Sequence, residues 1–133
     1  MFKLSIVSPE RILFEEEIQS LIVPGSEGYL GILAHHAPLI ATLKVGKITL
    51  RNEANVEKIL AVSGGFVEVS DNQATILADT VEFVDEIDLE RAHNELQRAQ
   101  ELLNMEVADQ ERLRAQHSLE KAKNRIKLAK GES

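Results

Sequence analysis

The chain has 133 residues, of which 44% are hydrophobic and 28% are charged. This length fits one compact domain, or one small domain with an appendage, and excludes a large multi-domain enzyme. The formal net charge of −7 argues against a nucleic-acid-binding protein, and the absence of cysteine excludes disulfides and thiolate metal sites. No apolar run approaches the ~20 residues of a membrane-spanning helix, and residues 1–7 do not resemble a secretion signal.

The first 84 residues alternate between short runs rich in Val, Ile and Thr and clusters of turn-forming residues. Strands are expected at residues 2–6, 18–23, 48–50, 59–62, 66–69 and 75–78. The turn signals between them include Pro24-Gly25, Gly46 and Ser63-Gly64-Gly65. Turns that recur every ~8–12 residues predict an antiparallel sandwich or barrel.

Three clusters in this part resemble functional motifs, and each also has a purely structural interpretation. The glycine-rich run at residues 25–31 matches neither a dinucleotide-binding pattern nor a P-loop, so we expect a tight exposed loop. His35 and His36 are adjacent and have no nearby third ligand, which favours a polar loop over a metal site. The three glutamates at residues 15–17 favour a solvated turn over an acid–base pair. No catalytic residue and no metal site is therefore expected.

From Asp85 onward the apolar period changes from two to about three and a half. The two apolar stripes are Leu89, Ala92, Leu96, Ala99 and Leu103, then Ala115, Leu119, Ala122, Ile126 and Ala129. They predict two amphipathic helices, with Asp85 as the N-cap of the first and Asp109 of the second. Residues 104–110 contain neither Gly nor Pro, so a hairpin and one continuous helix of roughly 70 Å both remain open.

Charge is distributed unevenly along the chain. Residues 1–84, 85–111 and 112–133 carry net charges of −5, −7 and +5. A basic tail of this kind can fold back on the acidic segment or bind an acidic surface elsewhere. Together with the change of period, this predicts a β domain at residues 1–84 and a two-helix domain at residues 85–133.

Four motifs, in this order, resemble the epsilon subunit of F-type ATP synthases. They are Pro24-Gly25-Ser26-Glu27-Gly28-Tyr29-Leu30-Gly31-Ile32, His36-Ala37-Pro38-Leu39, Ser63-Gly64-Gly65-Phe66-Val67-Glu68-Val69 and Ile87-Asp88-Leu89-Glu90-Arg91-Ala92. The resemblance spans nearly the whole chain. It implies a β sandwich of about ten strands in two sheets, followed by an antiparallel helical hairpin. It also implies a non-catalytic central-stalk (rotor) subunit that couples proton translocation to ATP synthesis.

The same resemblance implies partners and contact residues. The sandwich would bind the gamma subunit and the c-subunit ring, with ring contacts at Glu27, Tyr29 and His36. The mobile hairpin would extend into the alpha and beta subunits of the catalytic head and inhibit ATP hydrolysis. Its contacts to beta would come from Arg112, Arg114, Lys123 and Lys127. The alternative for these cations is a solvated basic face paired to the acidic first helix.

The motif that begins at Ile87 resembles one with which some family members bind regulatory ATP. The positions carried over are Glu82, Ile87, Asp88, Arg91, Ala92, Arg98, Lys121 and Arg125. Helical spacing places Asp88, Arg91 and Arg98 on one face. Lys121 departs from the family's usual arginine and lacks its planar fork. The alternative is that Arg91 and Glu95 form a helix-surface ion pair and bind no nucleotide.

The implied location is peripheral to the bacterial cell membrane, on its cytoplasmic face, or to the thylakoid membrane on its stromal face. Apart from regulatory ATP, no obligatory cofactor is expected, and no nucleic-acid partner. A free-standing ATP-sensing adaptor is the main rival interpretation. A small sandwich enzyme is a weaker one, because no nucleophile, base or metal cluster is assembled in the sequence.

Overall fold

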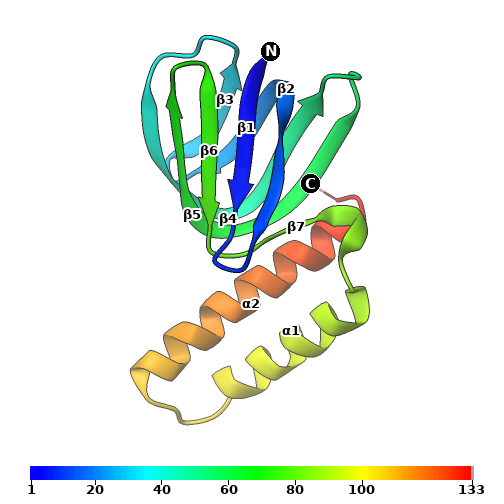
Figure 1. The fold of residues 1–133 in the computed structure, drawn as a ribbon. Helices are drawn as coiled ribbons and strands as arrows, with labels where there is room; N and C mark the ends of the chain where they lie inside the picture. Colours follow the sequence, from blue (N-terminus) through cyan, green and yellow to red (C-terminus); the bar gives the residue numbers. More distant parts are fainter. Residues whose placement is uncertain (133) are drawn as a thin grey trace. The chain divides into compact units, whose positions relative to one another are not determined.

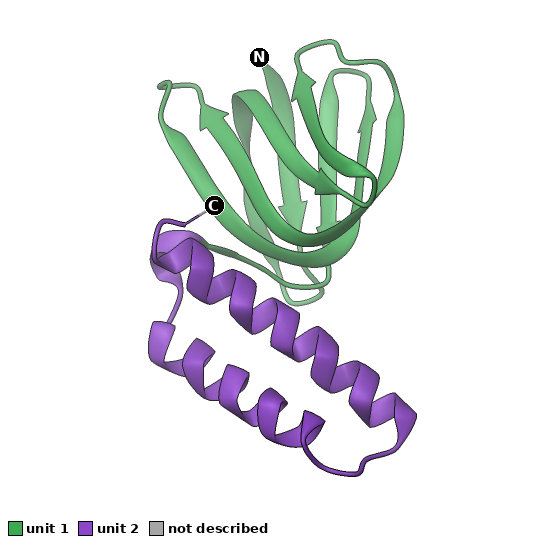
Figure 2. Cartoon of the chain, turned by 180° about the vertical axis from the view of Figure 1, so that it is seen from behind, with its two compact units in different colours: residues 1–83 green, residues 84–133 purple. Residues whose placement is uncertain are grey.

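The computed structural model describes residues 1–132 and divides into two units, residues 1–83 and residues 84–133, which Figure 2 shows in separate colours. The strands of the first unit are β1 (Phe2–Val7), β2 (Ile12–Gly25), β3 (Gly28–Leu33), β4 (Leu39–Asn52), β5 (Glu57–Ser70), β6 (Gln73–Ala78) and β7 (Val81–Phe83). The second unit contains a 3₁₀ turn, η1 (Val84–Glu86), and two helices, α1 (Leu89–Leu103) and α2 (Asp109–Ala129) (Figure 1). A β domain followed by two C-terminal helices is therefore confirmed.

The strands of the first unit form one sheet that closes on itself like a barrel. Its hydrogen-bonded order is β1-β6-β5-β4-β2-β3, with β7 paired to β5. Strand β1 closes the sheet because it pairs in parallel with β6 and antiparallel with β2. Within residues 1–132 there are seven strands in a single sheet, so the prediction of about ten strands in two sheets is wrong.

The difference arises because three of the strands are long and pass through positions that the sequence marks as turns. Strands β2, β4 and β5 have 14 residues each. Gly46 lies inside β4 and Gly64-Gly65 lie inside β5, while β4 and β5 keep one antiparallel register past these glycines. Gly64 and Gly65 have φ angles of 84° and 117°, which glycine adopts without a Cβ clash. These glycines thus let a strand bend where turns were predicted.

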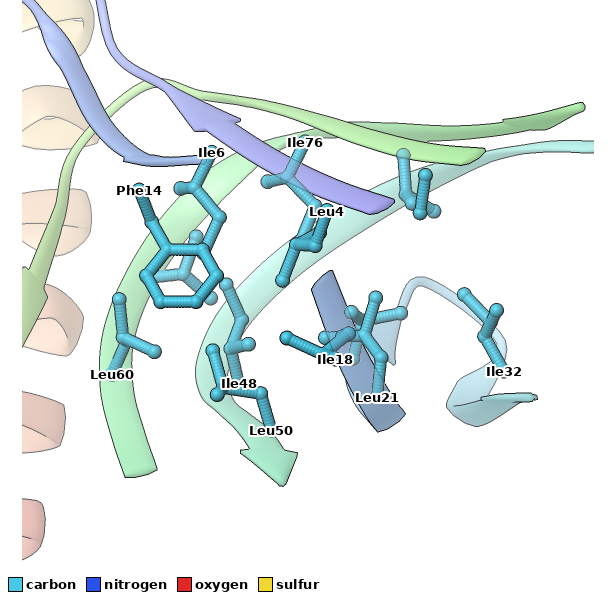
Figure 3. Close-up of a cluster of buried hydrophobic side chains, with 14 of the residues drawn as sticks. Leu4, Ile6, Phe14, Ile18, Leu21, Ile32, Ile48, Leu50, Leu60 and Ile76 are labelled. Atoms are coloured by element: carbon cyan, nitrogen blue, oxygen red, sulfur yellow. The ribbon is translucent and has the colours of Figure 1, made fainter. Parts of the chain in front are cut away.

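Alternate side chains of these strands fill the core of the first unit. In β1 the predicted alternation is realised, since Phe2, Leu4 and Ile6 are buried between partly exposed residues. Figure 3 shows Leu4 and Ile6 projecting into a cluster that also contains Ile48 and Leu50 of β4. Burial of each such side chain stabilises the fold by about 1.5–3 kcal/mol, so this unit has a substantial core of its own.

The helices of the second unit begin differently from the prediction. Asp85 lies in the 3₁₀ turn η1, and Asp88 is the N-cap of α1, where its carboxylate accepts a hydrogen bond of 3.1 Å from the Arg91 N–H. The turn therefore shifts the cap by three residues. The N-cap of α2 is Ala108, without a side-chain hydrogen bond, so the capping role predicted for Asp109 is also wrong.

Small side chains allow α1 and α2 to pack closely as a hairpin, with the chain leaving helical conformation between Leu103 and Asp109. Ala92 and Ala99 of α1 and Ala115 and Ala122 of α2 are at most 3% exposed. Each pair is spaced seven residues apart and therefore lies on one face of its helix. Within residues 1–132 no helix is long and apolar enough to cross a membrane.

Candidate functional site

Two of the residues predicted to bind a nucleotide, Asp88 and Arg91, lie at the start of α1. Asp88 is engaged as the helix cap, so its carboxylate is held at the start of the helix. One turn further on, Arg91 Nε donates to Glu95 Oε1 over 3.1 Å. The Arg91 side chain is 73% exposed, and an exposed pair of this spacing stabilises a helix by only about 0.3–0.5 kcal/mol.

A second arginine reaches the same carboxylate from the other helix. Arg125 of α2 donates from Nη1 to Glu95 Oε2 over 3.2 Å, and its side chain is 13% exposed. Each oxygen of Glu95 thus accepts from a different guanidinium, one on its own helix and one on α2, 30 residues further along the chain. Glu95, 33% exposed, is the point at which the cations of the two helices converge. Sequence reasoning considered Glu95 only as a local partner of Arg91.

The other residues of the predicted nucleotide set lie in several places. Arg98 lines a hollow beside Glu95, and Lys121 is half-buried on α2, one turn before Arg125. Ile87 precedes α1, and Ala92 is fully buried, so Ala92 contributes packing and not a ligand contact. Glu82 belongs to β7 of the first unit.

The hollow between the helices has a volume of about 370 Å³. Its lining residues are Glu95, Arg98, Ala99, Leu102, Glu111, Arg114, Ala115 and Ser118. Two arginines, one from each helix, therefore line this space, together with the small side chains of Ala99, Ala115 and Ser118. Within residues 1–132 neither Arg98 nor Arg114 forms a side-chain hydrogen bond or an ion pair.

The cations predicted to contact a partner occupy different surroundings. Arg112 donates to the carbonyl oxygens of Leu103 and Met105 over 3.2 and 3.1 Å. It thereby satisfies the carbonyl of the last residue of α1, which has no helical partner, and a carbonyl of the loop that follows. Lys123 and Lys127 are exposed on α2.

The predicted loop at residues 25–31 is a β-hairpin in the structure. Gly25 pairs with Gly28 across a two-residue turn, and the chain continues as β3, so the tight exposed loop is confined to residues 26–27 and the rest of the run is strand. The hairpin and the start of β4 line a groove of about 510 Å³ that includes Glu27 and Tyr29. The Tyr29 hydroxyl accepts a hydrogen bond of 3.3 Å from the Lys47 N–H, which holds the half-exposed ring across β4.

His36, the third residue of the predicted ring contact, is not among the residues lining this groove. Its Nδ1 lies 2.7 Å from the Ala37 carbonyl oxygen. His35 has a φ of 62°, and its N–H donates to Asn72 Oδ1 over 2.7 Å. Asn72 also donates to the Met1 carbonyl over 3.0 Å, and so ties two turns to the N-terminal strand, a role that sequence reasoning missed.

The three glutamates at residues 15–17 lie within strand β2 with exposed side chains, so the prediction that they form a turn is wrong, although they are solvated as expected. Glu15 accepts from Lys3 Nζ over 3.2 Å, with both side chains nearly half-exposed, as in an ordinary cross-strand surface pair. Within residues 1–132 no group of three or more His, Asp or Glu side chains is arranged to hold a metal ion.

Sequence comparison finds two matches that together span nearly the whole chain. Residues 1–84 match the beta-sandwich domain of the ATP synthase delta/epsilon chain, and residues 85–130 match its long alpha-helix domain. The chain is 46% identical to the ATP synthase epsilon chain of Desulforamulus reducens over 127 residues, which is 96% of both chains. It is 43% identical to that of Moorella thermoacetica, over 95% of this chain and 94% of the relative.

Solved structures share the fold at lower identity. A chain of the Euglena gracilis mitochondrial ATP synthase, in a structure of OSCP, F1 and c-ring, aligns with a TM-score of 0.77 and 22% identity. That alignment covers 91% of this chain and 76% of the other. A chain from the central stalk and c-ring of the Tetrahymena thermophila mitochondrial ATP synthase aligns with a TM-score of 0.65 and 16% identity, over 96% and 95% of the two chains.

Proposed function

This chain belongs to the ATP synthase epsilon chain family, and from that premise we propose that it is a non-catalytic subunit of the central rotor of an F-type ATP synthase. The observation that carries this proposal is the match of both units, in order and over 96% of the chain, to relatives named as ATP synthase epsilon chains. The rotor subunit would couple proton translocation to ATP synthesis without performing chemistry itself.

In this proposal the first unit attaches the chain to the rest of the rotor. It binds the gamma subunit and meets the c-subunit ring through Glu27, Tyr29 and His36. The closed sheet supports this role, because a packed core transmits torque with little deformation. The hydrogen bond from Lys47 to the Tyr29 hydroxyl supports it too, since it holds the β2–β3 hairpin against β4. The complex would lie at the cytoplasmic face of a bacterial membrane, or the stromal face of a thylakoid, held there by its partners.

The second unit is the regulatory element of the proposal. Extended, it contacts the alpha and beta subunits and inhibits ATP hydrolysis, with Arg114, Lys123 and Lys127 exposed on α2 for such contacts. Folded, it binds ATP through Arg91, Arg98, Lys121 and Arg125. Arginine and lysine bind phosphate oxygens through charge-assisted hydrogen bonds, so no P-loop is needed. Bound ATP stabilises the folded hairpin by its greater affinity for that state.

Reconstitution with gamma, alpha and beta tests the division of labour. A chain ending at residue 84 retains the whole core of the first unit. We expect it to co-purify with gamma and to leave ATP hydrolysis uninhibited, whereas the full chain binds and inhibits. A truncated chain that inhibits as strongly as the full chain would exclude the regulatory role, and a full chain that does not co-purify with the complex would favour a free-standing adaptor.

A further inference from the structure

The carboxylate of Glu95 occupies the place where cations of both helices meet. Arg91 of α1 holds one of its oxygens at 3.1 Å and Arg125 of α2 holds the other at 3.2 Å. A carboxylate that accepts from two guanidinium groups resembles, in charge and in oxygen spacing, an anionic phosphate group held by the same donors.

This contact also links the helices mechanically. The buried residues at the centre of the α1 and α2 stripes are alanines, which bury little area. The Arg125–Glu95 pair is partly shielded from water, since the two side chains are 13% and 33% exposed. It is therefore less screened than the exposed Arg91–Glu95 pair.

Space exists for Glu95 to leave this position. Its side chain also borders the hollow of about 370 Å³, which Arg98 and Arg114 line. Arg98 is three residues further along α1, and side chains at that spacing are neighbours on a helix surface. A carboxylate turned away from Arg91 and Arg125 thus remains beside other cations.

We propose that Glu95 is an internal competitor for the anion site of the folded hairpin. Its carboxylate holds Arg91 and Arg125 while no nucleotide is bound, and the polyphosphate of ATP must displace it. The inference rests on the proposed binding of ATP to the second unit. Because the competing contact must open first, the apparent affinity for ATP equals the intrinsic affinity multiplied by the fraction of molecules in which the contact is open. Glu95 therefore sets the ATP concentration to which the hairpin responds.

Two effects of opposite sign follow for Glu95→Gln. The amide is neutral, so it competes less for the arginines and ATP binds more tightly, by about tenfold for loss of a charge-assisted contact. The empty hairpin loses part of its link between α1 and α2, so it unfolds at a lower temperature. A Glu95 with only a structural role would weaken hairpin stability and ATP binding together.

The test is calorimetric titration of the full chain with ATP and with inorganic tripolyphosphate, alongside thermal unfolding followed by circular dichroism. Glu101→Gln is the matched control, because it removes one negative charge from an exposed position on the same helix. Glu95→Ala is a second variant, since alanine is the best helix former and preserves α1. We expect both Glu95 variants to bind each anion at least about fivefold more tightly than Glu101→Gln.

The outcomes separate this inference from the function on which it rests. Wild-type binding of ATP with no gain in either Glu95 variant over Glu101→Gln overturns the competitor role and leaves ATP binding intact. Tighter tripolyphosphate binding by the Glu95 variants, with ATP bound by no protein, supports the competitor role and removes the nucleotide from the proposed function. Binding of neither anion by any protein overturns both.

Discussion

The interiors of the two units of this chain are built from different kinds of side chain. The first unit buries a continuous cluster of mostly Ile, Leu, Val and Phe residues inside a closed sheet (Figure 3). Within residues 84–132 the buried hydrophobic residues are four alanines and Leu128, and charged side chains add the contacts of Arg125 with Glu95 and of Arg112 with the Leu103 carbonyl. A buried alanine contributes far less than a buried leucine, because the benefit scales with the apolar area removed from water.

This difference predicts that the first unit is rigid and that the second unit opens more easily. Local segments with few buried apolar contacts open at lower free-energy cost than core strands. We therefore expect the helical unit to open at a lower free-energy cost than the sheet. The same contrast orders the mutational effects expected in the two units.

The largest effect is expected in the sheet, for Gly65→Ala. The φ angle of Gly65 is 117°, and an added Cβ would overlap the Leu77 carbonyl oxygen and lie 2.8 Å from the Ala78 Cα. Both contacts are with backbone, so neither can relax cheaply. We expect the free energy of unfolding to fall by at least about 3 kcal/mol, measured by chemical denaturation followed by circular dichroism.

Gly31→Ala is the matched control for this variant. Gly31 lies in β3, and an added Cβ there would meet no atom within 4 Å. We expect its unfolding free energy to stay within about 0.5 kcal/mol of wild type. Equal stability of the two variants would show that β5 can shift away from β6 without cost, contrary to a rigid sheet.

Gly65 also shows why the sheet was harder to predict than the helices. The helical stripes depend on spacing within one segment, and the structure places helices over both of them. A glycine signals conformational freedom, but whether the chain turns or bends there depends on the strand beside it. The pairing of β1 with both β2 and β6 joins residues up to about 70 positions apart, which local patterns do not encode.

The same reasoning applies to the candidate site. The spacing of Arg91 and Glu95 predicts their ion pair, because residues four apart are neighbours on a helix. The contact between Glu95 and Arg125 depends on how two helices align, and so it could not be predicted from the sequence. Asp88 was within the recognised motif, yet its capping role required knowing that η1 precedes the helix.

An intermediate effect is expected at the helix interface, for Ala92→Leu. Ala92 is fully buried and does not line the hollow of about 370 Å³, so three extra carbons at this position would push α1 and α2 apart. We expect the helical unit to lose about 1–3 kcal/mol of stability, seen as an earlier loss of the circular dichroism signal at 222 nm. The sheet should keep its unfolding midpoint.

Gln97→Leu is the control for this substitution, because Gln97 is exposed on the same helix and leucine has a similar helix propensity. Its signal at 222 nm should be lost at the wild-type temperature. An Ala92→Leu variant as stable as this control would mean that the interface has room for a larger side chain, and close packing of the helices would then not explain its alanines.

The smallest effect is expected for Arg112→Ala. Its guanidinium caps the end of α1 through the carbonyls of Leu103 and Met105, at a partly exposed position. We expect a loss of about 1 kcal/mol and faster hydrogen exchange of the amides at residues 103–108. Lys123→Ala, which removes an exposed cation from the same helix, should leave that exchange unchanged.

Exchange at this turn also bears on the proposed contact of Arg112 with the beta subunits. In the folded hairpin both terminal nitrogens of its guanidinium already donate to the carbonyls of Leu103 and Met105, so a partner that takes over these bonds requires the turn to open first. Arg112→Ala would then lower the cost of opening and remove a contact in the extended state, and the two effects oppose each other in the inhibited complex. Unchanged exchange with weaker inhibition would assign Arg112 to the partner alone, and faster exchange with unchanged inhibition would assign it to the turn.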